Sequence, residues 1–346
     1  MAHFHIRAEE RENERRTPVT PASAAALVAQ GHKVTVEDSE TRCILTAALA
    51  EAGADIAPAG SWRQAADTAV ILGLKELPAG LTPLAHAHIM FGHAFKGQPD
   101  GPALLSRFRA GDGRLLDLEY LTDQDGRRLA AFGYWAGFAG AGVSLIAYAA
   151  QANAGLCPAV GVYESADSLA ADIRRRLGTL SPRAIVIGAL GRVGTGARDM
   201  CSRAGVATTG WDIAETAHGG PYPEVLEHEV FLNCILAGPG CPQFVPPDTA
   251  TRTRKLRVIG DIACDPGSDY NPVPVYDRAT SWEAPVIRIA ERPVLDVMAI
   301  DNLPSLLPAE SSEDFAAQLL PLLLDFDTDR HGAWSRSEAV FRSHVE

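Results

Sequence analysis

The sequence predicts an α/β protein built from two Rossmann-like, doubly wound domains with parallel sheets. Short apolar, β-branched segments alternate with helical segments, which is the pattern of parallel sheets. One strand–turn–helix–strand segment, residues 183–212, carries a glycine-rich pattern typical of dinucleotide sites. The length of 346 residues exceeds one ordinary hydrophobic core and suits two domains.

The glycine-rich segment begins with the apolar run 184–187, which predicts a buried strand. Asp212 ends the second strand, about 24 residues after the first glycine. Glycines let the backbone approach a pyrophosphate, and the helix N-terminus offers unpaired N–H groups. The spacing departs from strict G-x-G-x-x-G, and a tight structural turn is the alternative. The glycines are Gly188, Gly191, Gly194 and Gly196.

Asp212 also predicts which cofactor binds. Its carboxylate would accept hydrogen bonds from an adenosine ribose, whereas its charge would repel a 2′-phosphate. No Lys or Arg lies between Ile213 and Ala217 to bind such a phosphate. We therefore expect NAD rather than NADP.

The first third of the chain alternates strands and helices. Helices are expected at 22–30, which follows a proline and precedes a glycine, and from Ser39 to near Gly53. Polar residues follow several of the strands, where ligands of open α/β sheets bind. The expected strands are 3–9, 33–37, a short piece at Ile56, 68–74, 88–93, 114–120 and 128–132, with Asp125-Gly126 as a hairpin turn between the last two.

The rest of the chain continues the pattern after a helix at 136–151. That helix is apolar on nearly all sides, so we expect it to be buried, between the two domains. The domains are expected at 1–135 plus 318–346 for substrate and catalysis and 136–317 for NAD, with the active site in the cleft between them. Later strands are expected at 229–236, 256–262 and 294–300, a loop at 265–274, a compact turn at 301–308, and helices at 313–324 and 333–344.

Composition and charge limit the partners. The formal net charge of −12 argues against nucleic acid or an anionic membrane. No apolar run approaches membrane-spanning length, and residues 1–16 contain no signal-peptide core. The six cysteines show no CxxC and no metal-ligand spacing. We expect a cytoplasmic protein with free thiols and small-molecule substrates; a monomer is compatible with the absence of coiled-coil heptads.

Charged side chains at predicted strand ends are candidates for chemistry. The pairs Arg15-Arg16 and Arg127-Arg128 suit carboxylate binding, with a solvated charged loop as the alternative for each. Lys75-Glu76 follows a buried strand, where desolvation would favour a lysine base; a surface pair is the alternative. His93 is an acid–base candidate. His86, His88 and His93 do not have the spacing of a metal site, so no metal is expected. No nucleophile elbow or Walker A sequence occurs.

Long sequence blocks resemble those of the NAD-dependent, lysine-forming saccharopine dehydrogenase family, within the two-domain alanine dehydrogenase/transhydrogenase-like superfamily. The resemblance covers nearly the whole chain. The blocks are Glu14–Pro21 (ERRTPVTP), Pro58–Trp62 (PAGSW), Gly73–Glu76 (GLKE), Phe91–Lys96 (FGHAFK), Gly126–Gly133 (GRRLAAFG), Ile187–Arg192 (IGALGR), Trp211–Ile213 (WDI) and Ile300–Pro308 (IDNLPSLLP).

The resemblance implies reversible oxidative deamination of saccharopine by NAD to lysine and 2-oxoglutarate. It implies that Lys75 is the base that deprotonates the secondary amine and that His93 is the acid–base group of imine hydrolysis. Implied substrate-binding residues are Arg16, Glu76, Gln98, Glu119, Arg128, Phe132, Ala263 and Asp265. Implied NAD contacts are Arg127, Gly191, Arg192, Asp212, Thr216, Leu236, Ile262, Ile300, Asp301, Asn302 and Leu303.

Two positions depart from the family pattern. Val193 stands where relatives carry a cysteine, so a redox link from the glycine loop to Cys234 is not expected; a redox role for Cys201 stays open. Leu236 replaces an aromatic residue near the adenine. Two alternatives also stay open: another amino-acid or opine-type dehydrogenase, such as an alanine dehydrogenase, and a non-catalytic NAD-binding protein. A monocarboxylic substrate would not need both Arg16 and Arg128.

Overall fold

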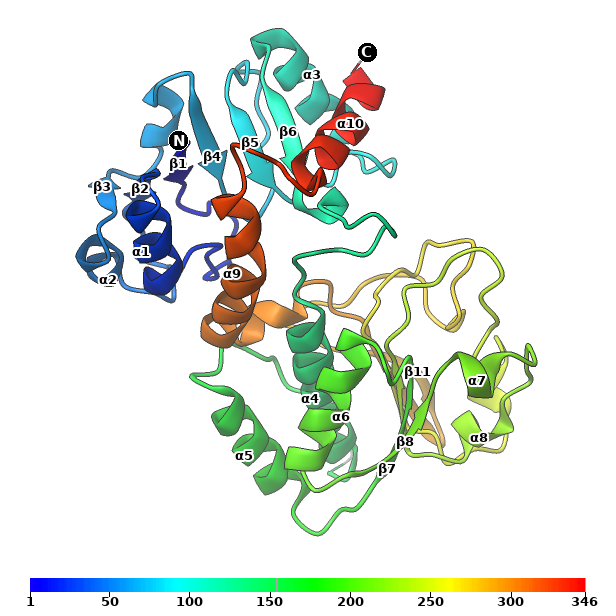
Figure 1. The fold of residues 1–346 in the computed structure, drawn as a ribbon. Helices are drawn as coiled ribbons and strands as arrows, with labels where there is room; N and C mark the ends of the chain where they lie inside the picture. Colours follow the sequence, from blue (N-terminus) through cyan, green and yellow to red (C-terminus); the bar gives the residue numbers. More distant parts are fainter. Residues whose placement is uncertain (154, 346) are drawn as a thin grey trace. The chain divides into compact units, whose positions relative to one another are not determined.

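Residues 1–153 and 155–345 are described by the computed structural model, in which the chain divides into two compact units (Figure 1). Unit 1 comprises Met1–Ala131 and Pro308–Glu346, and unit 2 comprises Phe132–Leu307. The chain enters unit 1 again at Pro308, where helix α9 begins, and not at 318 as the sequence indicated. Proline has the backbone angle of a first helical residue and lacks the N–H that such a position leaves unpaired.

Unit 1 is built on a six-stranded, entirely parallel sheet in the order β3-β2-β1-β4-β5-β6. Its central strands are buried on both faces because helices cover the sheet, which explains their near-continuous apolar sequences. The strands are β1 (His3–Ile6), β2 (Lys33–Glu37), β3 (Asp55–Ala57), β4 (Ala69–Leu72), β5 (Ala87–Met90) and β6 (Arg114–Asp117).

The helices of unit 1 come from both ends of the chain. Thr20 and Ser23 form a capping box that starts α1, and α10 packs on β6 and α3 (Figure 1). The helices are α1 (Pro21–Ala29), α2 (Thr46–Glu51), α3 (Gly101–Gly111), α9 (Pro308–Leu324) and α10 (Ala333–Val345), with 3₁₀ turns η1 (Ser61–Gln64) and η2 (Leu118–Tyr120).

Unit 2 contains a second six-stranded sheet in the order β11-β12-β10-β9-β7-β8. All of its pairs are parallel except β11 with β12, so one edge strand is antiparallel. The strands are β7 (Arg183–Ile187), β8 (Ala207–Trp211), β9 (Val230–Asn233), β10 (Val258–Asp261), β11 (Ile287–Glu291) and β12 (Val294–Met298).

Hydrophobic cores lie on both faces of this sheet because alternate residues of each strand point to opposite sides. Ala184 and Val186 belong to the core under α4, α5 and α6, whereas Ile185 and Ile187 belong to the core on the other face, with α8. The helices are α4 (Gly133–Gln151), α5 (Ala166–Leu177), α6 (Arg192–Arg203), α7 (Ile213–Thr216) and α8 (Pro223–Leu226), with 3₁₀ turns η3 (Thr249–Thr251) and η4 (Leu303–Leu306).

The structure confirms the α/β fold class and corrects several elements. Residues 39–45 are not helical, and α2 begins only at Thr46. The segment 128–132 is no strand: Thr122 and Arg128 form a single antiparallel bridge around the turn at Gly126, which has φ +78°. The helix α3, the helix α5 and the antiparallel strand β11 were not predicted. Among the described residues, no helix is long and apolar enough to cross a membrane.

Candidate active site

The candidate chemical groups of unit 1 follow the carboxyl ends of neighbouring strands. The strands β1, β4, β5 and β6 are parallel neighbours, so the segments that leave them start at one edge of the sheet. The residues brought to this edge are Glu14 and Arg16 after β1, Lys75 and Glu76 after β4, His93 and Lys96 after β5, and Glu119 after β6.

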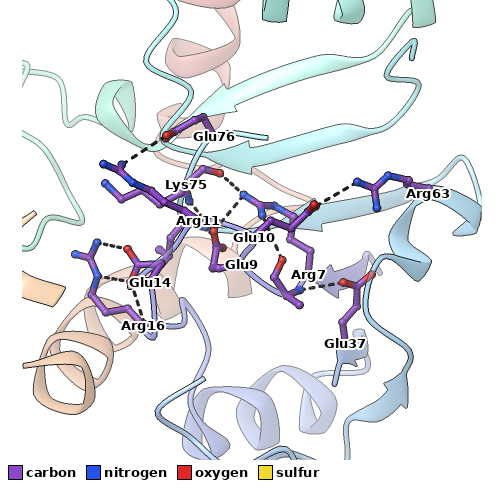
Figure 2. A network of polar contacts seen from close by, with 12 residues as sticks. Arg7, Glu9, Glu10, Arg11, Glu14, Arg16, Glu37, Arg63, Lys75 and Glu76 are labelled. Carbon is purple, nitrogen blue, oxygen red and sulfur yellow. Dashed lines mark hydrogen bonds and ion pairs between the residues drawn. The ribbon is translucent and has the colours of Figure 1, made fainter. Parts of the chain in front are cut away.

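Lys75 is held through its backbone by a buried ion pair (Figure 2). The carboxylate of Glu9 accepts the backbone N–H groups of Leu74 at 2.7 Å and Lys75 at 3.1 Å. The Arg7 guanidinium donates to the carbonyl oxygen of Lys75 and pairs with Glu9 at 3.3 Å. Lys75 itself is only 8% exposed. Its position is therefore fixed by groups with almost no access to water, as a base of defined geometry requires.

Glu14 links the lysine to Arg16 (Figure 2). Its two carboxylate oxygens accept from Arg16 Nε at 2.8 Å and Nη2 at 2.6 Å. Burial opposes the charged form of Glu14, but the charges of Arg16 and Lys75 outweigh it and hold the pKa of Glu14 below its ordinary value. The sequence did not identify Glu14 as a site residue; its position two residues before Arg16 was the available signal.

Glu76, the neighbour of Lys75, faces a different arginine. Its carboxylate lies 3.5 Å from Arg11 Nη1, and both side chains are more than a third exposed (Figure 2). An exposed pair of this kind contributes little to stability.

His93 lies in the loop after β5 and not in a strand. The sequence predicted a strand from 88 to 93, but β5 ends at Met90 and His93 has φ +48°. The preceding residue, Gly92, donates its N–H to Asp117 Oδ2 at 3.1 Å. The charge of His93 acts on Glu119, which follows the neighbouring strand β6.

Glu119 binds two cations at the end of β6. Its Oε1 accepts from Lys96 Nζ at 2.6 Å and from Arg128 Nη2. Burial opposes the charged form of Glu119, but Lys96 and Arg128 outweigh it and keep its pKa below the ordinary value. Arg128 is a little over a third exposed, so its guanidinium is accessible to an anionic substrate. Lys96 was not predicted as a site residue.

The other predicted residues near this edge are more peripheral. Gln98 accepts from the Lys96 backbone at 2.8 Å, and Arg127 is an exposed turn residue whose N–H donates to Asp123. Phe132 is the first residue of unit 2, at the N-cap of α4.

The glycine-rich turn of unit 2 follows the predicted geometry. Gly188 has φ +86°, and Gly191 is the N-cap of α6. A Cβ at Gly194 would overlap the carbonyl oxygen of Gly188, so only glycine permits this approach of helix and turn. Arg192 opens α6 and is exposed. The turn therefore presents backbone N–H groups at a helix N-terminus, as a pyrophosphate requires.

Asp212 directly follows β8 and is the N-cap residue of α7. Its Oδ2 accepts from Leu190 N at 3.0 Å, and its Oδ1 accepts from Ile213 N at 2.9 Å. The carboxylate thus fixes the backbone of the glycine-rich turn at Leu190 and of the segment after β8 at Ile213. Three aliphatic side chains of unit 2 are strongly exposed: Leu190 and Ile213, whose backbone N–H groups donate to Asp212, and Leu236, which follows β9.

The remaining predicted NAD contacts of unit 2 differ in how far their side chains are buried. Asp301 is exposed and Asn302 accepts from Trp282 Nε1 at 3.1 Å. The others have their side chains in the core, so they can offer a ligand mainly backbone atoms: Thr216, Ile262, Ile300 and Leu303. Ala263 and Asp265 line a small cavity at the ends of β9 and β10, together with Asn233 and Asp261.

His88 and Cys201 are buried in unit 1 and unit 2, respectively. His88 is buried against Trp62 and Phe108, and burial lowers its pKa well below the ordinary value. Within residues 1–153 and 155–345, no three His, Cys, Asp or Glu side chains gather as a metal-ligand set. Cys201 is a buried free thiol whose pKa burial raises to about 12.

Comparisons with known proteins agree with this architecture. Residues 5–139 match the family model of the alanine dehydrogenase/PNT N-terminal domain. A solved L-alanine dehydrogenase covers 98% of this chain and 93% of its own at TM-score 0.67 with 16% identity, and a Sinorhizobium meliloti transhydrogenase covers 94% of each chain at TM-score 0.60 with 17% identity. These structures share the fold.

Two fungal relatives match over nearly their whole length. The saccharopine dehydrogenase [NAD(+), L-lysine-forming] of Schizosaccharomyces pombe is 40% identical, covering 99% of this chain and 98% of its own. That of Yarrowia lipolytica is also 40% identical, covering 99% and 97%. The chain belongs to the family of NAD-dependent, L-lysine-forming saccharopine dehydrogenases.

Proposed function

We propose that this protein catalyses the reversible reaction of saccharopine, NAD⁺ and water to L-lysine, 2-oxoglutarate, NADH and a proton. The observation that carries the proposal is full-length similarity to enzymes with this stated activity. The chemistry of the unit 1 edge supports it, since a lysine, a histidine and two arginines follow neighbouring strands there.

Lys75 would accept the proton of the secondary amine, and His93 would exchange protons as water adds to the imine and the amine leaves. Burial and fixed backbone contacts suit Lys75 for this role. NAD, when bound, supplies the hydride acceptor. The charge of Lys75 acts on Glu14 and helps to hold the pKa of that carboxyl below its ordinary value, so the two groups interact.

Arg16 and Arg128 would bind substrate carboxylates. In this structure one edge of Arg16, Nε and Nη2, is engaged by Glu14, and Arg128 is engaged by Glu119. A substrate carboxylate would therefore bind Arg16 through its other edge or displace Glu14. The substrate-binding roles of Glu76, Gln98, Glu119, Phe132, Ala263 and Asp265 belong to the same proposal.

Unit 2 would bind NAD through the turn at Gly191 and Arg192 and through Asp212, with Thr216, Leu236, Ile262 and residues 300–303 as further contacts. Arg127 is part of the same proposal as an NAD contact. Specificity for NAD fits the carboxylate of Asp212 and the exposed aliphatic side chains beside it. A cytoplasmic location and a monomeric state remain parts of this proposal.

An alanine dehydrogenase-like activity is the second candidate, favoured by the shared fold. Two arginines at one sheet edge argue for a substrate with several carboxylates over a monocarboxylic one. The third class, a non-catalytic NAD-binding protein, gives no reason for a lysine held as Lys75 is.

The variants Lys75→Met and His93→Gln test the assignment. Each should lower kcat for NADH oxidation with lysine and 2-oxoglutarate by roughly 10²–10⁴-fold, the usual scale for acid–base groups, while NADH still binds. Lys33→Met is the matched control, since Lys33 is exposed and pairs only loosely with Asp55 at 3.8 Å. Unchanged turnover in both active-site variants would rule out the assigned chemistry.

A further inference from the structure

Asp117 is a buried carboxylate that contacts residues of the candidate active site, and the proposed chemistry assigns it no role. Asp117 ends β6 and is 1% exposed. Burying a carboxylate is costly, and an apolar residue would fill the place at lower cost if packing were its only purpose. The contacts of Asp117 show what the carboxylate does instead.

Each oxygen of Asp117 holds one backbone segment of the site. Oδ2 accepts from Gly92 N at 3.1 Å, and Oδ1 accepts from Glu119 N at 2.8 Å. Gly92 directly precedes His93, which has φ +48°, a conformation that L side chains rarely adopt. Glu119 carries the contacts to Lys96 and Arg128. One side chain therefore spans two loops that carry separate parts of the site.

We propose that Asp117 is a positioning residue: its carboxylate fixes the backbone at Gly92 and at Glu119, and through them orients the His93 side chain and the Glu119–Arg128 pair. The catalytic consequence rests on the proposed function, whereas the positioning of His93 does not.

The ionised form of Asp117 is the one that can accept from both backbone N–H groups. A carboxylate accepts at both oxygens, whereas a protonated acid or an amide has one acceptor oxygen and a donor group in the other place. Burial raises the pKa of Asp117 to about 6, the two backbone N–H groups and the Arg128 charge oppose the rise, and the Glu119 charge adds to it. Strongly perturbed carboxyls of this kind cluster at functional sites.

A second contact at the same place provides a matched control. Ser337, on α10, donates its hydroxyl to the carbonyl oxygen of Asp117 at 2.9 Å, and it is fully buried. The variant Ser337→Ala removes a hydrogen bond from the end of β6 but leaves both carboxylate contacts in place. Asp117→Asn keeps the size of the side chain and disrupts at least one of them.

The first measurement needs no activity. A ¹H–¹³C spectrum of the histidine rings, with the His93 signal assigned by its loss in His93→Gln, should show that signal displaced in Asp117→Asn and unmoved in Ser337→Ala. An unmoved His93 signal in folded Asp117→Asn overturns the proposal, whether or not the protein proves to be a saccharopine dehydrogenase.

The second measurement is kinetic. Asp117→Asn should lower kcat about ten- to hundredfold, the scale of small misplacements, and raise KM for 2-oxoglutarate while the Kd for NADH stays unchanged. Ser337→Ala should lower the thermal midpoint without this pattern. Equal kinetic losses in the two variants at equal thermal midpoints would show a merely structural role and overturn the proposal. Absence of activity in the unaltered protein would contradict the proposed function, and the ring spectrum would still decide the positioning.

Discussion

Charged side chains of the unit 1 site occur in sets, and each cation is accompanied by a carboxylate. Glu14 accompanies Arg16 and Lys75, Glu119 accompanies Lys96 and Arg128, and Glu9 accompanies Arg7. Such pairs keep buried charges from being isolated, which would cost several kcal/mol each. They also orient the guanidinium groups of Arg16 and Arg128, which the proposed function assigns to substrate carboxylates.

The Glu14–Arg16 pair predicts a pH dependence of stability. The folded-state pKa of Glu14 lies below its ordinary value of 4.5, so its contribution is present above pH 4.5 and is lost as pH falls below that value. Glu14→Gln should lower the free energy of unfolding near neutral pH by about 3 kcal/mol, because it leaves Arg16 buried without this partner.

Urea unfolding across a pH series tests this. The difference between the unaltered protein and Glu14→Gln should shrink below pH 4.5. Asp55→Asn, which alters an exposed pair, should show only a small difference throughout. A Glu14→Gln difference that is constant across the series would contradict the account.

At the scale of single residues, Asp212 also predicts the cofactor preference. Replacing it by serine keeps an oxygen that can accept from Ile213 N but removes the charge that repels a 2′-phosphate. Asp212→Ser should reduce the preference for NADH over NADPH roughly ten- to hundredfold, from the Coulomb energy of nearby charges. KM values for both cofactors measure this, with Asp277→Ser, an exposed position, as the charge-matched control. An unaltered preference would show that Asp212 does not face the ribose.

At the scale of elements, sequence patterns succeeded where local physics decides the outcome. The buried strand predicted from the run 184–187, the glycine-rich turn after it and the helix that follows depend on burial and glycine geometry. The structure confirms them as β7, the turn and α6, with Gly191 at the N-cap of α6. The predictions of a helix over residues 39–45 and of a strand at 128–132 were wrong. In the first segment, the helix begins only at Thr46. In the second, Arg128 forms a single antiparallel bridge and no strand. Both outcomes depend on contacts that sequence periodicity does not encode.

The same distinction applies to the site. Lys75 and His93 could be singled out from their places after apolar runs, whereas Glu14 and Asp117 could not. Their roles depend on groups that the fold brings from other segments: the charge of Lys75 acts on Glu14, and Gly92 N donates to Asp117. Pairings between loops after different strands are long-range, and no spacing rule specifies them.

The turn between β7 and α6 predicts the effect of a single methyl group. Gly194→Ala should displace the turn, because the added Cβ would overlap the Gly188 carbonyl, and overpacking of this kind costs about 1–3 kcal/mol. NADH binding should weaken along with the thermal midpoint of unfolding. Gly161→Ala is the control, since a Cβ there meets nothing within 4 Å. Equal NADH affinity in both variants would contradict the role of this turn.

At the scale of the whole molecule, the chain separates the two tasks. Unit 2 is one continuous segment, Phe132–Leu307, with its own sheet and cores, and it contains the glycine-rich turn and Asp212. Lys75, His93, Arg16 and Arg128 belong to unit 1. Cofactor binding and acid–base chemistry should therefore be separable.

A fragment of residues 132–307 tests the separation. We expect it to fold and to bind NADH, with a rise in its thermal midpoint as NADH is added, and to show no turnover. Far-UV circular dichroism and NADH fluorescence measure both properties. A folded fragment that does not bind NADH would show that unit 1 is required for the cofactor.

The central claim is the reaction itself, and NADH oxidation measures it most directly. Purified protein should consume NADH with L-lysine and 2-oxoglutarate together and form saccharopine in equal amount, and it should not consume NADH with either compound alone. Consumption with pyruvate and ammonium instead would contradict the account and favour the alanine dehydrogenase-like alternative.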